Sequence, residues 1–273
     1  MSITPFTDPA LIAGPLYADA NRLARRTSAL HAAKISGPDA TATITDLAAT
    51  AAPGAGVVCD IGCGRGSTTA ALAARLAPAQ LIAVDQSAAL LATVTARLAR
   101  AGQPVTTLVA DFHHIPLLDR SVDLAVAAFC LYHSPHPQQA LTEIRRCLRP
   151  GGHVVLATKS ACSYREIDQL VATSGLDPDA VARPSLYQSL HTDTITQITE
   201  GVLTVEAVVS QQHVFRFNDL NHIAAYVATS PKYQLAKQMA GDPVALGAAL
   251  RARLLDRPVT ATSTVTYVLA RRR

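Results

Sequence analysis

The 273-residue sequence contains no tryptophan, and only 4% of its residues are aromatic. Without tryptophan, and without a basic stretch interleaved with aromatic residues, the chain lacks the usual platform for stacking unpaired bases. It also lacks a run of roughly 18 or more apolar residues, the length that a membrane-spanning helix requires. We therefore expect no nucleic-acid partner and no membrane-spanning segment.

Cysteine is sparse, and the charge is nearly balanced. The five cysteines form no C-x-x-C pair, so the sequence predicts neither a disulfide framework nor a metal site. The formal net charge is +4, and its short basic spots indicate a solvated surface. Residues 1–15 show no basic start followed by an apolar core, so no signal peptide is expected and a cytoplasmic protein is predicted.

The most informative stretch is Val57–Gly66. A short apolar strand containing Asp60 runs into glycines at positions 62, 64 and 66, and the helix-forming run 67–76 follows at once. Missing side chains let the backbone approach a ligand closely. The first turn of the helix offers free N–H groups and the positive end of its dipole. The stretch predicts a strand–turn–helix unit that binds a ligand.

A second strand, predicted at residues 80–84, ends in Asp85, at the offset of about 20 residues typical of an acid that binds a ribose diol. The dinucleotide fingerprint G-x-G-x-x-G would need its last glycine where Ser67 stands. An acid at Asp60 would also repel a pyrophosphate but attract an ammonium group. These details favour S-adenosylmethionine over NAD(P), and argue against an oxidoreductase.

Further motifs follow in order along the chain. A third strand at residues 105–110 ends in Asp111-Phe112, a fourth is predicted at 121–127, and Leu148-Arg149-Pro150-Gly151-Gly152 leads into a fifth. Over residues 55–160 the set resembles the class I S-adenosylmethionine-dependent methyltransferases. The L-R-P-G-G turn is similar to that of the small-molecule branch, methyltransferase type 11 or UbiE-like.

The resemblance implies a fold and a division of the chain. The fold is an α/β, Rossmann-like, seven-stranded and mostly parallel sheet flanked by helices, with its last strand antiparallel. Residues 1–54 would form an N-terminal helical cap, in which Asp39 is a plausible N-cap. Residues 55–160 would form the S-adenosylmethionine-binding core. Residues 161–273 would complete the sheet and carry a helical insertion that walls the substrate pocket.

The resemblance also assigns cofactor contacts. Asp60 would face the ammonium group and Asp85 the ribose, while Asp111 would accept a hydrogen bond from the adenine amino group. Phe112 would pack on the adenine, and His113 and His114 would shape that pocket. The cofactor-binding positions expected are Asp60, Gly62, Cys63, Gly64, Gly66, Asp85, Gln86, Asp111, Phe112 and Ala128.

Methyl transfer needs a general base only where the acceptor must lose a proton. His133 and His136, which follow the fourth strand, are the catalytic candidates, because histidine titrates near neutrality. The alternative is that His133 forms a pocket wall. His191 with Asp193 could form a base and its orienting acid, although a surface loop is the favoured interpretation.

The N-terminal helix offers Tyr17, Arg22 and Arg25 as substrate contacts. The predicted activity is methyl transfer to a small-molecule acceptor, such as a bacterial specialised metabolite in antibiotic biosynthesis. A methyltransferase for RNA or protein and a non-catalytic S-adenosylmethionine-binding scaffold remain open. The chain could act as a monomer or a homodimer.

Overall fold

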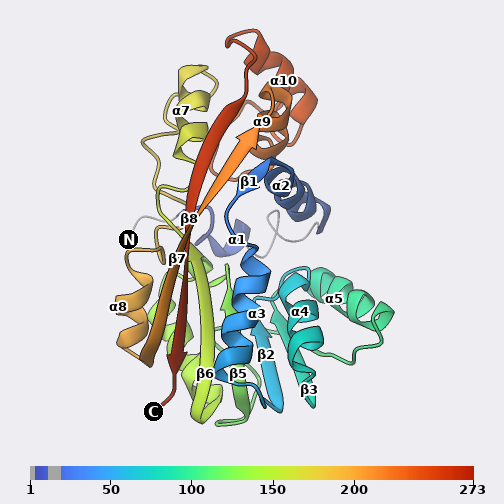
Figure 1. Ribbon diagram of the computed structural model, residues 1–273. Coiled ribbons are helices and arrows are strands. Elements are labelled where there is room, and N and C mark those ends of the chain that lie inside the picture. The colour runs from blue at the N-terminus through green and yellow to red at the C-terminus, as the bar shows by residue number, and fades with distance from the viewer. Residues whose placement is uncertain (1–3, 12–19) are drawn as a thin grey trace. The chain divides into compact units, whose positions relative to one another are not determined.

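The computed structural model describes residues 4–11 and 20–273 (Figure 1). The chain divides into two compact units, each assembled from separate segments. The first unit contains the chain up to Gly37 together with residues 160–188 and 211–264, and the second contains residues 38–159, 189–210 and 265–273. The functional division expected from the sequence, into a cap, a cofactor-binding core and a C-terminal region with boundaries at residues 54 and 160, stays a prediction.

Within the described residues, eight strands form one sheet in the order β1-β7-β8-β6-β5-β2-β3-β4. Pairing is parallel from β6 to β4, and β8 is antiparallel to β6, so the Rossmann-like, mostly parallel sheet with an antiparallel last strand is confirmed. The strand that was not expected is β1, which pairs antiparallel with β7. The strands are β1 (Lys34–Ser36), β2 (Val57–Ile61), β3 (Gln80–Asp85), β4 (Thr106–Val109), β5 (Val122–Ala128), β6 (Leu148–Lys159), β7 (Thr204–Phe217) and β8 (Val259–Arg271).

The central strands are nearly continuous apolar runs, as expected of parallel strands that helices cover on both faces. Val57 pairs with Gln80 and Ile61 with Val84, while Val58 pairs with Leu124 on the other side of β2. The chain therefore reverses its direction of winding between β2 and β5. Open α/β sheets bind ligands beyond the carboxyl ends of their strands at such a switch point.

In the second unit, three helices cover one face of this sheet. Ile44, Leu72 and Leu98, one from each helix, share a buried cluster with Val58 and Leu124. Asp39 caps the first of these helices by accepting a hydrogen bond from the Ala42 amide at 2.8 Å, as predicted. The helices of this unit are α3 (Ala40–Ala51), α4 (Ser67–Leu76), α5 (Ala88–Arg100), η2 (Leu131–His133), α6 (Pro137–Cys147) and α8 (Ile195–Glu200).

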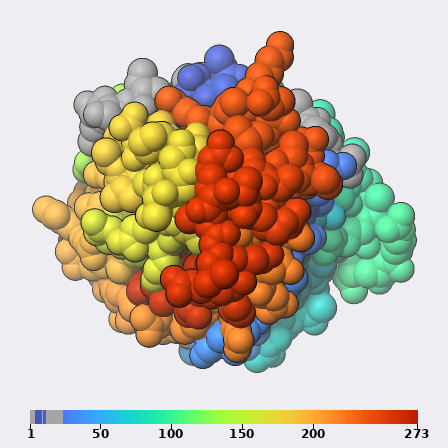
Figure 2. All heavy atoms as spheres, turned by 90° about the horizontal axis from the view of Figure 1, so that it is seen from above, coloured from blue at the N-terminus to red at the C-terminus, as the bar shows by residue number. Residues whose placement is uncertain are grey.

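The first unit has its own core, in which Leu30, Ile167, Phe217, Ile223 and Leu246 are buried together. Its surface places residues 160–188 beside residues 240–264 (Figure 2), and the Thr262 hydroxyl donates to the Glu166 carboxylate at 2.8 Å. Its helices are α1 (Pro9–Leu11), α2 (Ala20–Ala33), α7 (Arg165–Thr173), α9 (Leu220–Val227) and α10 (Pro243–Arg251). The C-terminal insertion is therefore helical, as expected.

Candidate cofactor site

Three acids lie at the carboxyl ends of neighbouring parallel strands in the second unit. Asp60 is the fourth residue of β2, Asp85 ends β3, and Asp111 follows β4 by two residues. Because the three strands are parallel neighbours, their carboxyl ends reach the same edge of the sheet. This is the edge at which the switch point between β2 and β5 lies.

The glycines between β2 and α4 all adopt left-handed backbone angles, with φ of 63° at Gly62, 55° at Gly64 and 74° at Gly66. Their surroundings differ. A Cβ on Gly62 would lie 2.4 Å from the Cβ of Cys130, whereas a Cβ on Gly64 would have no atom within 4 Å. Gly62 is therefore needed for packing, while Gly64 borders open space.

Asp60 is buried, with 1% of its surface exposed. Its Oδ2 accepts a hydrogen bond from the Thr69 hydroxyl on the first turn of α4, at 2.6 Å. Burial raises the pKa of Asp60 to about 7, the Thr69 hydrogen bond opposes this shift, and the nearby Asp85 carboxylate adds to it. A buried carboxyl in this condition is stabilised in its charged form by a cationic partner.

Asp85 closes the glycine turn. Its Oδ2 accepts from the Gly64 amide at 2.9 Å, and its Oδ1 accepts from the Ser87 amide at 2.9 Å. Burial raises the pKa of Asp85, and these backbone hydrogen bonds partly offset the shift. Cys63 also ties the turn to β3, because its amide donates to the Val84 carbonyl at 3.1 Å. The turn thus presents Gly64 and Asp85 side by side.

The adenine side of the expected site is built from the segment that follows β4. Asp111 has 48% of its side chain exposed, whereas Phe112 is buried. The Gln86 amide nitrogen lies 3.5 Å from Asp111 Oδ2, at the limit of a hydrogen bond. The structure therefore brings Gln86 and Asp111 together just beyond the ends of the adjacent strands β3 and β4.

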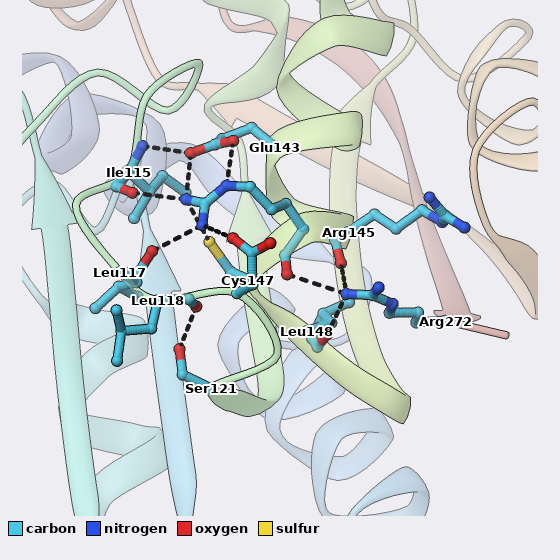
Figure 3. A network of polar contacts seen from close by, with 11 residues as sticks. Ile115, Leu117, Leu118, Ser121, Glu143, Arg145, Cys147, Leu148 and Arg272 are labelled. Atoms are coloured by element: carbon cyan, nitrogen blue, oxygen red, sulfur yellow. Dashed lines mark hydrogen bonds and ion pairs between the residues drawn. The ribbon is translucent and has the colours of Figure 1, made fainter.

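Arg146 on α6 fastens the loop between β4 and β5. Its guanidinium forms a two-point ion pair with Glu143, with distances of 2.9 and 2.7 Å, and also donates to the carbonyls of Ile115 and Leu117 (Figure 3). The Ile115 amide in turn donates to Glu143 at 2.8 Å. The hydrogen bonds from Arg146 lower the pKa of Glu143. Side chains from α6 therefore hold this loop in place, and no sequence motif predicted this network.

The end of β5 is strained. After the half-buried Ala128 comes Phe129, with φ of 57°, a conformation that costs a non-glycine residue about 1–2 kcal/mol. The Lys159 ammonium lies 5.8 Å from the centre of the Phe129 ring. Backbone strain of this kind clusters at functional sites, and here it precedes the segment that carries His133.

His133 ends the short helix η2 and is half-buried, with its ring 4.7 Å from that of Tyr132. His136 is exposed and provides the N-cap position of α6 without a side-chain cap. His191 Nδ1 lies 3.4 Å from Asp193 Oδ2, but 78% of the Asp193 side chain is exposed. A catalytic role for any of these histidines stays a proposal.

The predicted substrate contacts are only partly described. Tyr17 lies outside the described residues, and so does the side chain of Arg22, whereas Arg25 is exposed on α2. Sequence reasoning missed their neighbour Arg26, whose guanidinium lies 5.7 Å from the centre of the Phe6 ring. Among the described residues, no hydrogen-bond partner meets the buried Nη1 of Arg26.

A membrane-spanning helix and a metal-binding cluster were searched for in residues 4–11 and 20–273. No helix in these ranges is long and apolar enough to cross a membrane. Within the same ranges, no group of three or more His, Cys, Asp or Glu residues is arranged to hold a metal ion.

Comparison with known proteins agrees with this geometry. Residues 59–156 match the family Methyltransf_11, a methyltransferase domain. The chain is 36% identical over 123 residues to a malonyl-[acyl-carrier protein] O-methyltransferase of Marinomonas sp. (strain MWYL1), covering 45% of this chain and 44% of the relative. It is 32% identical over 213 residues to the biotin biosynthesis bifunctional protein of Bordetella avium (strain 197N), covering 78% of this chain and 42% of the relative.

A candidate methyltransferase from Bacillus halodurans C-125 has a crystal structure of the same fold, with a TM-score of 0.59 at 16% identity, covering 85% of this chain and 98% of that one. The chain spans less than half the length of the two curated relatives. The resemblance noted in the sequence is confirmed: the chain carries a class I methyltransferase domain. Enzymes of this family use S-adenosylmethionine as their cofactor.

Proposed function

We propose that this chain transfers a methyl group from S-adenosylmethionine to a small-molecule acceptor. The observation that carries the proposal is the pairing of open space at Gly64 with the buried carboxyl of Asp60 and the half-buried carboxyl of Asp85. The cofactor has one ammonium group and a ribose diol, and these groups match a buried acid beside a glycine turn. The bound cofactor supplies the methyl group and the sulfonium leaving group.

In this proposal, each part of the site binds a different part of the cofactor. Asp60 pairs with the ammonium group, and the amides of the glycine turn lie close to the amino-acid end. Asp85 accepts hydrogen bonds from the ribose hydroxyls, and Asp111 accepts one from the adenine amino group. Phe112 and Gln86 complete the adenine side. The chain's contribution to rate is to position the acceptor and to exclude water.

The acceptor is proposed to be a bacterial specialised metabolite. The name of the Marinomonas relative specifies malonyl-[acyl-carrier protein] and favours a second candidate, an acyl group presented on a carrier protein. An acceptor screen with labelled methyl donor, using free acids and their carrier-bound forms in parallel, separates the two.

The cofactor assignment is tested by calorimetric titration with S-adenosylmethionine, S-adenosylhomocysteine and NAD(P). We expect saturable binding of the first two and none of the third. The matched variant is Asp85→Ala, which should weaken binding by about 1–3 kcal/mol because ribose hydroxyls lose their partner. Unchanged affinity in a folded Asp85→Ala protein would remove Asp85 from the site.

His133 is proposed to act on the acceptor side, as base or as pocket wall. If it is the base, His133→Ala should lower kcat by roughly 10²- to 10⁴-fold while cofactor affinity stays the same. If it is a wall, the variant should change KM for the acceptor and leave the pH profile of kcat as in the wild type. His136→Ala, three residues further along the chain and exposed, is the comparison variant.

A further inference from the structure

Three polar side chains from two separate parts of the second unit form one hydrogen-bonded row beside the candidate cofactor site. Asp111 Oδ1 lies 2.7 Å from His113 Nδ1, and His113 Nε2 lies 2.8 Å from Ser134 Oγ. The row ends at the His136 amide, which donates to Ser134 Oγ at 2.9 Å. It joins the segment after β4 to the segment after β5.

The chemistry of the groups fixes the direction of each bond. An ionised carboxylate only accepts hydrogen bonds, so the Nδ1 of His113 carries the hydrogen that is donated to Asp111. In a neutral imidazole the other nitrogen, Nε2, then accepts, and the Ser134 hydroxyl is the donor that lies within reach. Ser134 Oγ keeps a lone pair for the His136 amide. Every donor in the row therefore meets an acceptor, which is the normal condition of buried polar groups.

The row fixes the orientation of Asp111. Oδ1 accepts from two donors of the same residue, the His113 amide at 2.8 Å and Nδ1 at 2.7 Å. These two bonds hold the carboxylate in one rotamer and engage one oxygen. Oδ2 is left facing Gln86 at 3.5 Å. It is therefore the oxygen through which Asp111 would accept a hydrogen bond from an exocyclic amino group.

The other end of the row lies in the core. Ser134 has 0% of its surface exposed, and its own amide donates to the Leu131 carbonyl at 3.0 Å. The η2 turn thus holds the backbone of Ser134, and the His136 amide holds its hydroxyl, both independently of the adenine side. His113 is a rigid link between a buried anchor and a half-exposed carboxylate.

We propose that His113 is a positioning residue through which Ser134 holds Asp111 Oδ2 in place to read the 6-amino group of adenine. His113 itself does not react and does not touch the transferred methyl group. This inference rests on the proposed function, because it assumes that adenine lies beside Asp111. It adds a specificity device that neither Asp111 alone nor the glycine turn would supply.

The test compares two ligands, S-adenosylhomocysteine and its analogue in which hydrogen replaces the 6-amino group. We expect the wild-type protein to bind the parent about tenfold more tightly, the value of one hydrogen bond to a charged acceptor. His113→Phe keeps an aromatic ring but removes both nitrogens. It should weaken the parent about tenfold and leave the affinity for the analogue unchanged.

The matched control is His153→Phe. His153 is half-buried like His113, but it pairs with Leu124 across β6 and β5, and its Nε2 lies 3.2 Å from Glu206 Oε2, so this variant should retain the wild-type preference for the parent ligand. Ser134→Ala removes a single oxygen atom and should reduce the preference in the same direction. The double variant His113→Phe with Ser134→Ala should be no worse than His113→Phe alone, because both changes break one link. If His113→Phe does not fold, Ser134→Ala carries the same comparison.

Equal weakening of both ligands by His113→Phe, or an equal loss in His153→Phe, would overturn the positioning role alone. Failure of the wild-type protein to bind either ligand would overturn the proposed function together with this inference. Circular dichroism and urea unfolding of each variant separate a local effect from a loss of fold.

Discussion

The glycine turn after β2 and the loop after β4 both present acids at the same edge of the sheet, but they hold them by different means. In the turn, Asp85 accepts hydrogen bonds from the Gly64 and Ser87 amides. In the loop, Asp111 accepts from both the amide and the imidazole of His113, and the guanidinium of Arg146 holds the chain behind it. The candidate site thus has a turn half, whose acid is held by backbone amides, and a loop half, which is held to a larger extent by side chains. The two halves should respond differently to mutation.

The difference extends to electrostatics. Burial raises the pKa values of Asp60 and Asp85, because the turn excludes water from them. Asp111 keeps almost half of its side chain in solvent. We expect the turn to govern binding through charge and the loop to govern it through the direction of hydrogen bonds.

The largest effect that would sharpen this comparison is expected at Gly62. Gly62→Ala combines a left-handed φ with a collision against Cys130, and it should lower the free energy of unfolding by about 3 kcal/mol. Gly64→Ala, with the same strain but open space, should lower it by about 1 kcal/mol while preventing cofactor binding. Urea denaturation and calorimetric titration measure the two effects. Similar stability losses in both variants would show that the surroundings of these glycines have been misjudged.

The next largest effect concerns Arg146, which supports the loop half. Arg146→Met removes the guanidinium that donates to Glu143 and to the Ile115 and Leu117 carbonyls, and should lower the free energy of unfolding by about 2 kcal/mol. The matched control is Arg75→Met, because the Arg75–Asp46 pair is exposed and 3.6 Å long. Exposed pairs contribute about 0–1 kcal/mol. Equal losses in urea denaturation would mean that the loop is not held by this network.

The smallest effect is a pH shift in the turn half. With a pKa of about 7, Asp60 holds a proton below neutrality, and a cationic ligand must displace it. Cofactor affinity should therefore fall as pH drops below 7, by up to about tenfold per unit. Thr69→Val removes the hydrogen bond that opposes the shift, so the fall should begin at a higher pH. Titrations between pH 6 and 8.5 follow both proteins. A pH-independent affinity in the wild type would contradict an ammonium–Asp60 pair.

The raised pKa of Asp60 also determines the direction in which the stability of the fold changes with pH. The folded chain binds a proton at Asp60 up to a pH of about 7, whereas the unfolded chain loses it near pH 4. Stability from this group is full below pH 4 and is lost as pH rises through 7. Asp60→Asn should accordingly be more stable than the wild type above pH 7 while binding the cofactor less tightly.

The turn half could be predicted from the sequence because its determinants are local. Glycines at alternate positions, a helix-forming run and an acid at the end of the next strand are adjacent in the chain, and α4 spans Ser67–Leu76 as expected. The loop half could not. Arg146 donates to carbonyls 29 and 31 residues away, and a carbonyl belongs to every residue type, so the pairing leaves no mark in the sequence.

The link between His113 and Ser134 was out of reach for a similar reason. Serine and histidine 21 residues apart carry no periodicity, and only the packing of η2 against the segment after β4 reveals them as partners. Strand β1 is a comparable case, because three residues, Lys34–Ser36, pair with β7 at positions that no local pattern specifies.

The tight contact between Gly62 and Cys130 has a practical consequence for measuring motion. Cys130 is one of four buried thiols, and Cys162 is the exposed one. The Cys130 thiol also donates to the Ile61 carbonyl at 3.2 Å, so a reagent reaches it only when the turn parts from the segment after β5. In a timed alkylation followed by mass spectrometry, the rate at Cys162 would give the reactivity of the reagent with an exposed thiol. The rate at Cys130 would measure how often the glycine turn opens.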